Sequence, residues 1–128
     1  MKEMVVLGRV QELGALGPRQ DADRWSMAVL GVLSDLLADA EGRRHFLSQL
    51  PGTLKARLLA EEPGAYEMDR DTLVQRIAAA LGVHARDGER ALRAVYRVLG
   101  EAVSAGQLAE YEARLPKDLA AFLEERQG

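Results

Sequence analysis

Apolar side chains recur along this chain with the spacing of helix faces, and one such pattern occurs twice. The pattern is an apolar run, a Leu-Pro turn and two leucines four residues apart: 28–33, Leu50-Pro51, Leu54 and Leu58, then 94–99, Leu115-Pro116, Leu119 and Leu123. Spacings of three and four residues place side chains on one face of a helix. The pattern therefore predicts an all-α protein with an internal repeat.

We expect a compact bundle of about eight short helices, arranged as two four-helix repeats with pseudo-two-fold symmetry. The expected helices cover residues 3–13, 21–38, 40–49, 51–60, 70–81 and 87–103, and two more begin at Ser104 and Pro116. The repeats span 1–60 and 69–125, and residues 61–68 link them. Because this linker is short, the halves should share a core and form a single domain over 1–128.

Residues that favour helix ends stand at these boundaries. We expect Gly14 and Gly82 to end helices in the left-handed conformation, which costs glycine no Cβ clash. Pro51 and Pro116 suit the first turn of a helix, where the missing N–H is not needed. The side chains expected to accept hydrogen bonds from the first amides are Asp21 or Asp23, Asp39, Asp69 or Asp71, and Ser104 together with Gln107.

The helix expected over 21–38 is apolar over an unusually wide face, because Leu30, Leu33 and Leu37 broaden the stripe that begins at Trp25. We therefore expect this helix to contact two neighbours and Trp25 to be a large core residue. Met27 and Gly31 indicate that their side of the helix is covered, either by another helix or by a second subunit.

Composition excludes several classes of function. The 128 residues include no Cys, which removes disulfides, thiolate zinc sites and thiol nucleophiles. The 17 basic and 20 acidic residues give a net charge of −3, which is too mild to favour a bulk nucleic-acid binder. No segment has the pattern of a signal peptide or a membrane span. We expect a soluble cytoplasmic protein that does not contact a membrane.

The repeated motifs resemble a bacterial family known as domain of unknown function 2267. The matching residues are Ala28-Val29-Leu30 to Leu33, Gln49-Leu50-Pro51, Ala94-Val95 to Leu99, and Arg114-Leu115-Pro116. The resemblance covers nearly the whole chain. The chain departs from the family at Val6 and Leu73, where Phe is frequent, and at Arg114, which replaces the second Gln. The resemblance implies a duplicated all-helical fold and transfers no catalytic residue.

No catalytic or metal-binding set can be assembled from the sequence. His45 shares a helix face with Glu41, but no second histidine stands at metal-ligand spacing, and His84 lies in an expected loop. The serines lie outside nucleophile motifs, and no glycine-rich phosphate loop is present. We therefore predict no enzymatic activity, no catalytic residue, no metal and no cofactor.

The clearest surface feature is a run of four arginines, Arg86, Arg90, Arg93 and Arg97, which we call the arginine stripe. At 100° per residue they fall at about 0°, 40°, 340° and 20°, opposite the apolar face, and Tyr96 borders them. One interpretation is a binding site for an acidic partner, a phosphate or RNA. The other is a solvated helix face on which Glu101 pairs with Arg97.

Three functions remain open from the sequence. The favoured one is a non-enzymatic helical module with a structural or protein-interaction role, either as a homodimer or with another protein. The alternative is binding of a polyanion or nucleic acid through the arginine stripe, and the third is a small ligand between the repeats. Function should lie where the repeats differ: Trp25 against Ala91, Met27 against Arg93, Gly31 against Arg97, and His45 against Glu110.

Overall fold

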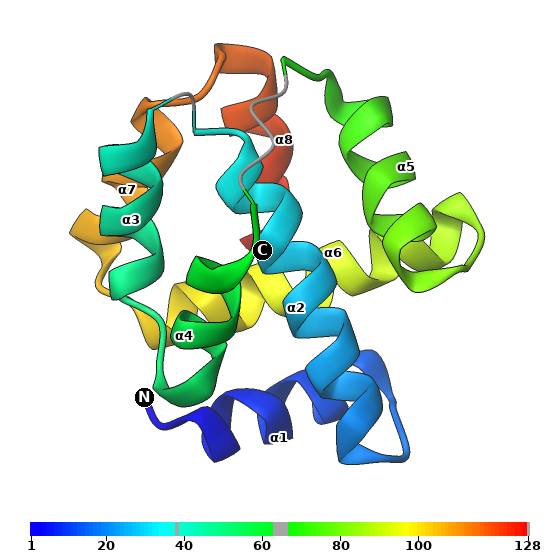
Figure 1. Cartoon of the computed structure of the whole chain (residues 1–128). Coiled ribbons are helices and arrows are strands. Elements are labelled where there is room, and N and C mark those ends of the chain that lie inside the picture. Colours follow the sequence, from blue (N-terminus) through cyan, green and yellow to red (C-terminus); the bar gives the residue numbers. More distant parts are fainter. Residues whose placement is uncertain (38, 63–66, 128) are drawn as a thin grey trace.

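The computed structural model describes residues 1–37, 39–62 and 67–127, which form eight α-helices and no strand (Figure 1). The helices are α1 (Glu3–Gly14), α2 (Arg19–Asp35), α3 (Ala40–Ser48), α4 (Gly52–Ala60), α5 (Arg70–Leu81), α6 (Ala85–Ala102), α7 (Ala105–Ala113) and α8 (Lys117–Gln127). The expected all-α class is confirmed. Part of the expected linker, residues 63–66, lies outside the described residues.

The long helices α2 and α6 meet at the centre of the molecule, and the shorter helices surround them (Figure 1). α1 packs on α2, α6 and α4, whereas α5 packs on α6, α2 and α8. α1 and α5 therefore both contact the two central helices and one shorter helix. The buried side chains of both halves form one continuous hydrophobic core. The pseudo-two-fold relation itself stays a prediction.

The wide apolar face of α2 is covered by helices of the same chain. Val29 and Leu33 are fully buried, Leu30 is 3% exposed, and Met27 is half-buried against the core. A Cβ added at Gly31 would lie 3.8 Å from Leu58 of α4. Neighbouring helices thus account for the breadth of this face.

Several helix ends follow the sequence prediction. Asp39 and Asp69 accept hydrogen bonds from first-turn amides of α3 and α5, and Ser104 and Gln107 form the predicted capping box of α7. Gly82 ends α5 with a φ of 68°. These helix ends could be predicted because each cap involves residues within four positions of one another.

The N-termini of α2 and α4 differ from the prediction. Neither Asp21 nor Asp23 caps α2, whose N-cap position is occupied by Pro18 without a side-chain bond. Asp23 instead accepts two hydrogen bonds from Arg57 of α4, at 2.7 and 2.9 Å. Pro51 stands at the N-cap of α4, one residue before the predicted first turn.

The carboxylate of Glu3 on α1 caps α4 across 50 positions of sequence. It accepts hydrogen bonds from the Thr53 hydroxyl at 2.5 Å and from the Leu54 amide at 3.1 Å. A carboxylate at a helix N-terminus is stabilised by the helix dipole as well as by these bonds. No local sequence pattern signals such a cap, because its two parts come from different helices.

Gly14 does not adopt the predicted left-handed conformation. Gly14 is the last residue of α1, and Ala15 beyond it is left-handed with a φ of 53°. Glycine at position 14 leaves room for the half-buried ring of Trp25, since a Cβ there would lie 2.6 Å from that ring. Ala15 stands 67 positions before Gly82, the left-handed residue that ends α5. The spacing of the predicted repeat therefore indicates this helix end, which the preference for glycine placed one residue too early.

Candidate binding sites along the arginine stripe

The outer face of α6 carries the arginine stripe, and the four arginine residues are exposed as predicted. Tyr96 does not share this surface, so its predicted place at the border of the stripe is wrong. Its side chain is fully buried, and its hydroxyl donates to the Glu112 carboxylate of α7 at 2.7 Å. Gln127 of α8 donates to the Tyr96 carbonyl, so α7 and α8 cover this side of α6. Burial raises the pKa of Tyr96 far above its ordinary value.

Neighbouring helices divide the arginine stripe between two cavities. Arg90, Arg93 and Arg97 line a pocket of about 130 Å³ between α1 and α6, which we call the α1–α6 pocket. Arg86 instead lines a groove of about 450 Å³ between α5, α6 and α8, which we call the α5–α8 groove. A helical wheel places all four arginines together because it omits the helices that pack beside them.

Arg90 ties the end of α1 to α6. Its Nη2 donates to the Gly14 carbonyl at 3.2 Å, which satisfies one of the carbonyls left without a partner at the helix C-terminus. Its Nη1 lies 3.3 Å from Asp87, and its guanidinium lies 5.8 Å from the centre of the Trp25 ring. Arg90 therefore has a structural role as well as a place in the pocket.

Few interactions hold the side chains of Arg93 and Arg97 in place. The closest acidic group to Arg93 is Glu89 at 3.8 Å, and no partner lies within ion-pair distance of Arg97 among the described residues. Glu101 does not form the predicted ion pair with Arg97. It accepts two hydrogen bonds of 2.9 Å from Arg9 of α1, and these bonds lower the pKa of Glu101.

The first half contains the same helix-end contact at the equivalent place. Arg24 on α2 donates to the Leu81 carbonyl at the end of α5, at 3.3 Å. Arg24 stands 66 positions before Arg90, and Leu81 stands 67 positions after Gly14. Residues at the spacing of the predicted repeat thus make the same kind of bond between a central helix and the end of the helix that crosses it.

The side chains next to the Arg24 bond differ from those next to the Arg90 bond. A pocket of about 350 Å³ lies between α2, α4 and α5, and we call it the α2–α5 pocket. Its wall includes Met27 and Gly31, which occupy the positions of Arg93 and Arg97. The contact that holds the helices is common to both halves, whereas the charge next to it is not.

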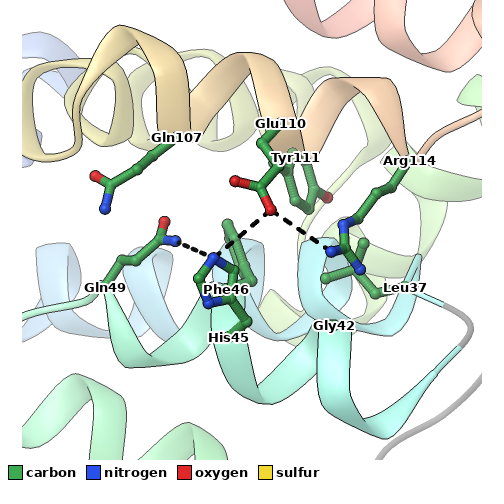
Figure 2. Close-up of a pocket in the computed structure, with 9 residues that line it drawn as sticks. All are labelled: Leu37, Gly42, His45, Phe46, Gln49, Gln107, Glu110, Tyr111 and Arg114. Carbon is green, nitrogen blue, oxygen red and sulfur yellow. Dashed lines mark hydrogen bonds and ion pairs between the residues drawn. The ribbon is translucent and has the colours of Figure 1, made fainter.

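A narrow cleft between α3 and α7 contains His45 (Figure 2). His45 Nε2 lies 3.7 Å from a carboxylate oxygen of Glu110 and 3.2 Å from the amide nitrogen of Gln49. The same carboxylate oxygen is 3.5 Å from Arg114. The cleft encloses about 10 Å³, roughly the space of one water molecule. Among the described residues, no three His, Asp or Glu side chains gather as they would around a metal ion.

Phe46 and Tyr111 also line this cleft, and their rings stack with their centroids 4.6 Å apart. The Tyr111 hydroxyl is buried and donates to the Leu33 carbonyl at 2.7 Å, and burial raises the pKa of Tyr111 well above its ordinary value. Phe46 and Tyr111 stand 65 positions apart, as do His45 and Glu110. Residues 65 positions apart thus face each other here, and the region is a contact between α3 and α7.

Residues 4–122 match the family described as "Uncharacterized conserved protein (DUF2267)". The chain belongs to this family. Membership in DUF2267 confirms the resemblance carried by the packing and turn motifs, and the family description states no activity. No curated protein matches this DUF2267 chain. Within the described residues, no helix is both long and apolar enough to cross a membrane.

Sequence reasoning missed two cationic residues of this DUF2267 protein, Arg70 and Arg126, which line the α5–α8 groove with Arg86. They lie on α5 and α8, so no single-helix pattern connects them. A comparison at the spacing of the predicted repeat does distinguish these residues. Glu3, Gln20 and Glu61 stand 67, 66 and 65 positions before Arg70, Arg86 and Arg126, so the first half has no cation at these positions. Positions at which one copy is basic and the other is not would have identified the groove.

Proposed function

We propose that this DUF2267 protein is a non-enzymatic interaction module that binds an acidic segment of another protein in the α1–α6 pocket. The observation that carries the proposal is the difference between this pocket and the α2–α5 pocket. The two pockets share the arginine that ties two helices together, and only one of them adds Arg93 and Arg97.

The first half serves as an internal control for what the fold requires. It forms the same helix crossing with Met27 and Gly31, so this crossing does not depend on two further guanidinium groups. Among the described residues, Arg97 has no ion-pair partner, and Arg93 has only the long 3.8 Å pair with Glu89, a carboxylate that also binds Arg126. Exposed charge that packing does not use and neighbouring carboxylates do not neutralise is the kind of feature that recognises a charged ligand.

The chemistry of the α1–α6 pocket fits an acidic side chain. Guanidinium groups bind carboxylates through paired, charge-assisted hydrogen bonds. Leu13 and Ala94 add apolar surface for the methylene groups of such a side chain. The net charge of −3 opposes the approach of a long polyanion, because repulsion acts over the whole length of a nucleic acid. We therefore favour a protein partner over nucleic acid.

A second copy of the chain is not the partner that we propose. The apolar face of α2 that suggested a homodimer is covered by α4 and the core, with Leu30 only 3% exposed. An acidic segment of a different protein requires no uncovering of this face.

The test uses Trp25, the only tryptophan, as a reporter, because the Arg90 guanidinium lies 5.8 Å from its ring. A glutamate-rich peptide is titrated at low ionic strength while tryptophan fluorescence is recorded. We expect saturable binding that weakens at least about tenfold when Arg93→Met and Arg97→Gln are combined, since each guanidinium bond to a carboxylate contributes about 1.5 kcal/mol or more.

The matched control is Arg44→Gln, which removes one exposed arginine from α3, outside the pocket. It should change the affinity by less than about twofold, because α3 does not line the pocket. Equal binding by the wild type and the Arg93→Met/Arg97→Gln variant would overturn the proposal. Single-stranded RNA that binds more tightly than the peptide, with a steep dependence on salt, would instead support the polyanion alternative.

A further inference from the structure

We infer that the α5–α8 groove is a second site, which binds a phosphate monoester. The groove encloses about 450 Å³ between three helices, within the usual range for small-molecule sites. It contains Arg86, the member of the arginine stripe that the α1–α6 pocket does not use. The site is therefore separate from the one proposed above.

Three guanidinium groups from three helices line the groove. Arg70 on α5 and Arg86 on α6 are exposed, and no ion-pair partner lies close to either one among the described residues. Arg126 on α8 lies deeper and is only 9% exposed. Three arginines around one cavity match a phosphate group, which presents three oxygens in different directions.

Arg126 is held in place but retains an unused donor. Its Nη2 is 2.5 Å from Glu89, and its Nη1 donates to the Phe122 carbonyl at 3.0 Å and to the Glu125 carboxylate at 3.1 Å. Its guanidinium stacks 3.7 Å from the centre of the Phe122 ring. The Nε–H is buried and finds no hydrogen-bond partner in the part of the chain that the structure describes. A buried donor left without a partner costs free energy, and an anion in the groove would offer it an acceptor.

The N-terminus of α6 lies at the same groove. His84 at the N-cap makes no side-chain cap, and Ala85 and Arg86, the first two residues of this 18-residue helix, line the groove. The first amides of a helix lack acceptors within the helix, and the helix dipole favours an anion beside them. The unpartnered Arg126 donor and this helix end are independent observations that indicate an anion.

The wall of the groove carries three arginines and two carboxylates, and the two exposed arginines, Arg70 and Arg86, form no ion pair among the described residues. Glu89 is engaged by Arg126 and lies 3.8 Å from Arg93, which leaves Asp71 as the other acidic side chain on the wall. In the first half, the positions equivalent to Arg70, Arg86 and Arg126 hold Glu3, Gln20 and Glu61. The first half therefore folds without cations at these positions, whereas the second half has three.

The remaining wall determines what the phosphate is attached to. Val74 and Phe122 supply apolar surface beside the guanidinium groups, and the groove is larger than a bare phosphate requires. An ester of phosphate with an apolar or aromatic group fills both parts of the groove. A free metabolite and a phosphorylated side chain of a protein share this chemistry.

Calorimetric titrations with phenyl phosphate, inorganic phosphate and a phosphotyrosine peptide test the site at low ionic strength. We expect phenyl phosphate to bind more tightly than inorganic phosphate, because only the ester contacts the apolar wall. Tighter binding of the peptide than of phenyl phosphate would assign the site to a phosphorylated protein, and the reverse order would assign it to a small molecule. Either order supports a monoester site.

The variants Arg70→Gln and Arg86→Gln should each weaken phenyl phosphate binding about tenfold, since each removes a charge-assisted contact. Both side chains are exposed, so circular dichroism should show unchanged helix content. Arg44→Gln, which removes an exposed arginine that lines neither cavity, is the matched control and should leave the affinity within about twofold. No phenyl phosphate binding at millimolar concentration, or equal binding by Arg70→Gln, Arg86→Gln and the wild type, would overturn the inference.

The same variants separate this inference from the proposed function. Combining Arg70→Gln with Arg86→Gln should leave the glutamate-rich peptide titration of Trp25 unchanged, because neither residue lines the α1–α6 pocket. Combining Arg93→Met with Arg97→Gln should leave phenyl phosphate binding unchanged. A loss of both ligands in both double variants would show that one diffuse cationic surface replaces the two sites.

Discussion

At two helix crossings of this DUF2267 chain, an arginine makes the same kind of bond, but the side chains beside that bond differ. At one crossing Arg90 binds the Gly14 carbonyl, and at the other Arg24 binds the Leu81 carbonyl. Next to these matched bonds, the second half has Arg93 and Arg97, and the first has Met27 and Gly31. The difference teaches that positions inside the crossing are constrained by packing, whereas positions at its rim are open to a binding role.

The halves also differ inside the core. Tyr96 and Tyr111 are buried in the second half, where the first half has Leu30 and Phe46 at the equivalent positions. The α5–α6 crossing depends on Gly88, whereas the equivalent residue of the α1–α2 crossing is the buried Ala22. Each difference can be tested by changing one half and using the other as the reference.

The largest expected effect is unfolding at high pH, caused by the two buried tyrosines of the second half. Burial raises the pKa of Tyr96 and Tyr111 above the value of about 10 that a phenol has in an unfolded chain. Above that pH the unfolded state loses protons that the folded state keeps. The free energy of unfolding should therefore fall by about 1.4 kcal/mol per pH unit for each phenol.

Phenolate absorbance at 295 nm and helical circular dichroism, recorded together, check this prediction. A Tyr66→Phe background leaves Tyr96 and Tyr111 as the two tyrosines, so their ionisation should appear only as helix is lost. Adding Tyr96→Phe should make the fall in stability shallower. Full ionisation of both phenols with the helices intact would contradict the burial described for the second half.

The second-largest expected effect is a loss of stability at Gly88, where α5 and α6 come close together. A Cβ at Gly88 would lie 2.9 Å from both the Ala78 Cβ and the Val74 carbonyl oxygen. Gly88→Ala should force α5 and α6 apart and lower the free energy of unfolding by about 2 kcal/mol, despite the better helix propensity of alanine.

The matched change in the first half is Ala22→Gly, since Ala22 is fully buried in α2. It should cost about 1 kcal/mol through the lower helix propensity of glycine. Urea denaturation of both variants measures the difference. A Gly88→Ala variant more stable than the wild type would show that the two crossings are equally spaced.

The smallest effect lies at the ends of α1 and α5, which use different residues in the same left-handed conformation. Ala15→Gly should raise the free energy of unfolding by up to about 1 kcal/mol, because it removes the steric cost of a Cβ at positive φ. Gly82→Ala should lower it by about the same amount, and a Cβ there would meet no neighbouring atom within 4 Å.

Thermal unfolding of Ala15→Gly, Gly82→Ala and the double variant tests this pair of helix ends. The two changes should offset each other in the double variant, because the sites are far apart and share no partner. Stabilisation by Gly82→Ala, or destabilisation by Ala15→Gly, would indicate that packing and not backbone conformation determines the choice of residue.

The sequence by itself determined the eight helices, the DUF2267 resemblance, the caps at Asp39, Asp69 and Ser104, and the exposure of the arginine stripe. These features depend on residues within a few positions of one another, so helix periodicity and capping rules suffice. The repeat carried further information, since the helix end at Ala15 can be read from its match to Gly82.

Only the tertiary structure decided that Tyr96 is buried, that Arg86 belongs to a different cavity from Arg93, and that Glu3 caps α4. Each of these facts depends on which helices lie side by side, and the residues involved are far apart in sequence. A helical wheel gives the direction of a side chain from its own axis, but only packing determines whether that direction leads to water, to a cavity or to another helix.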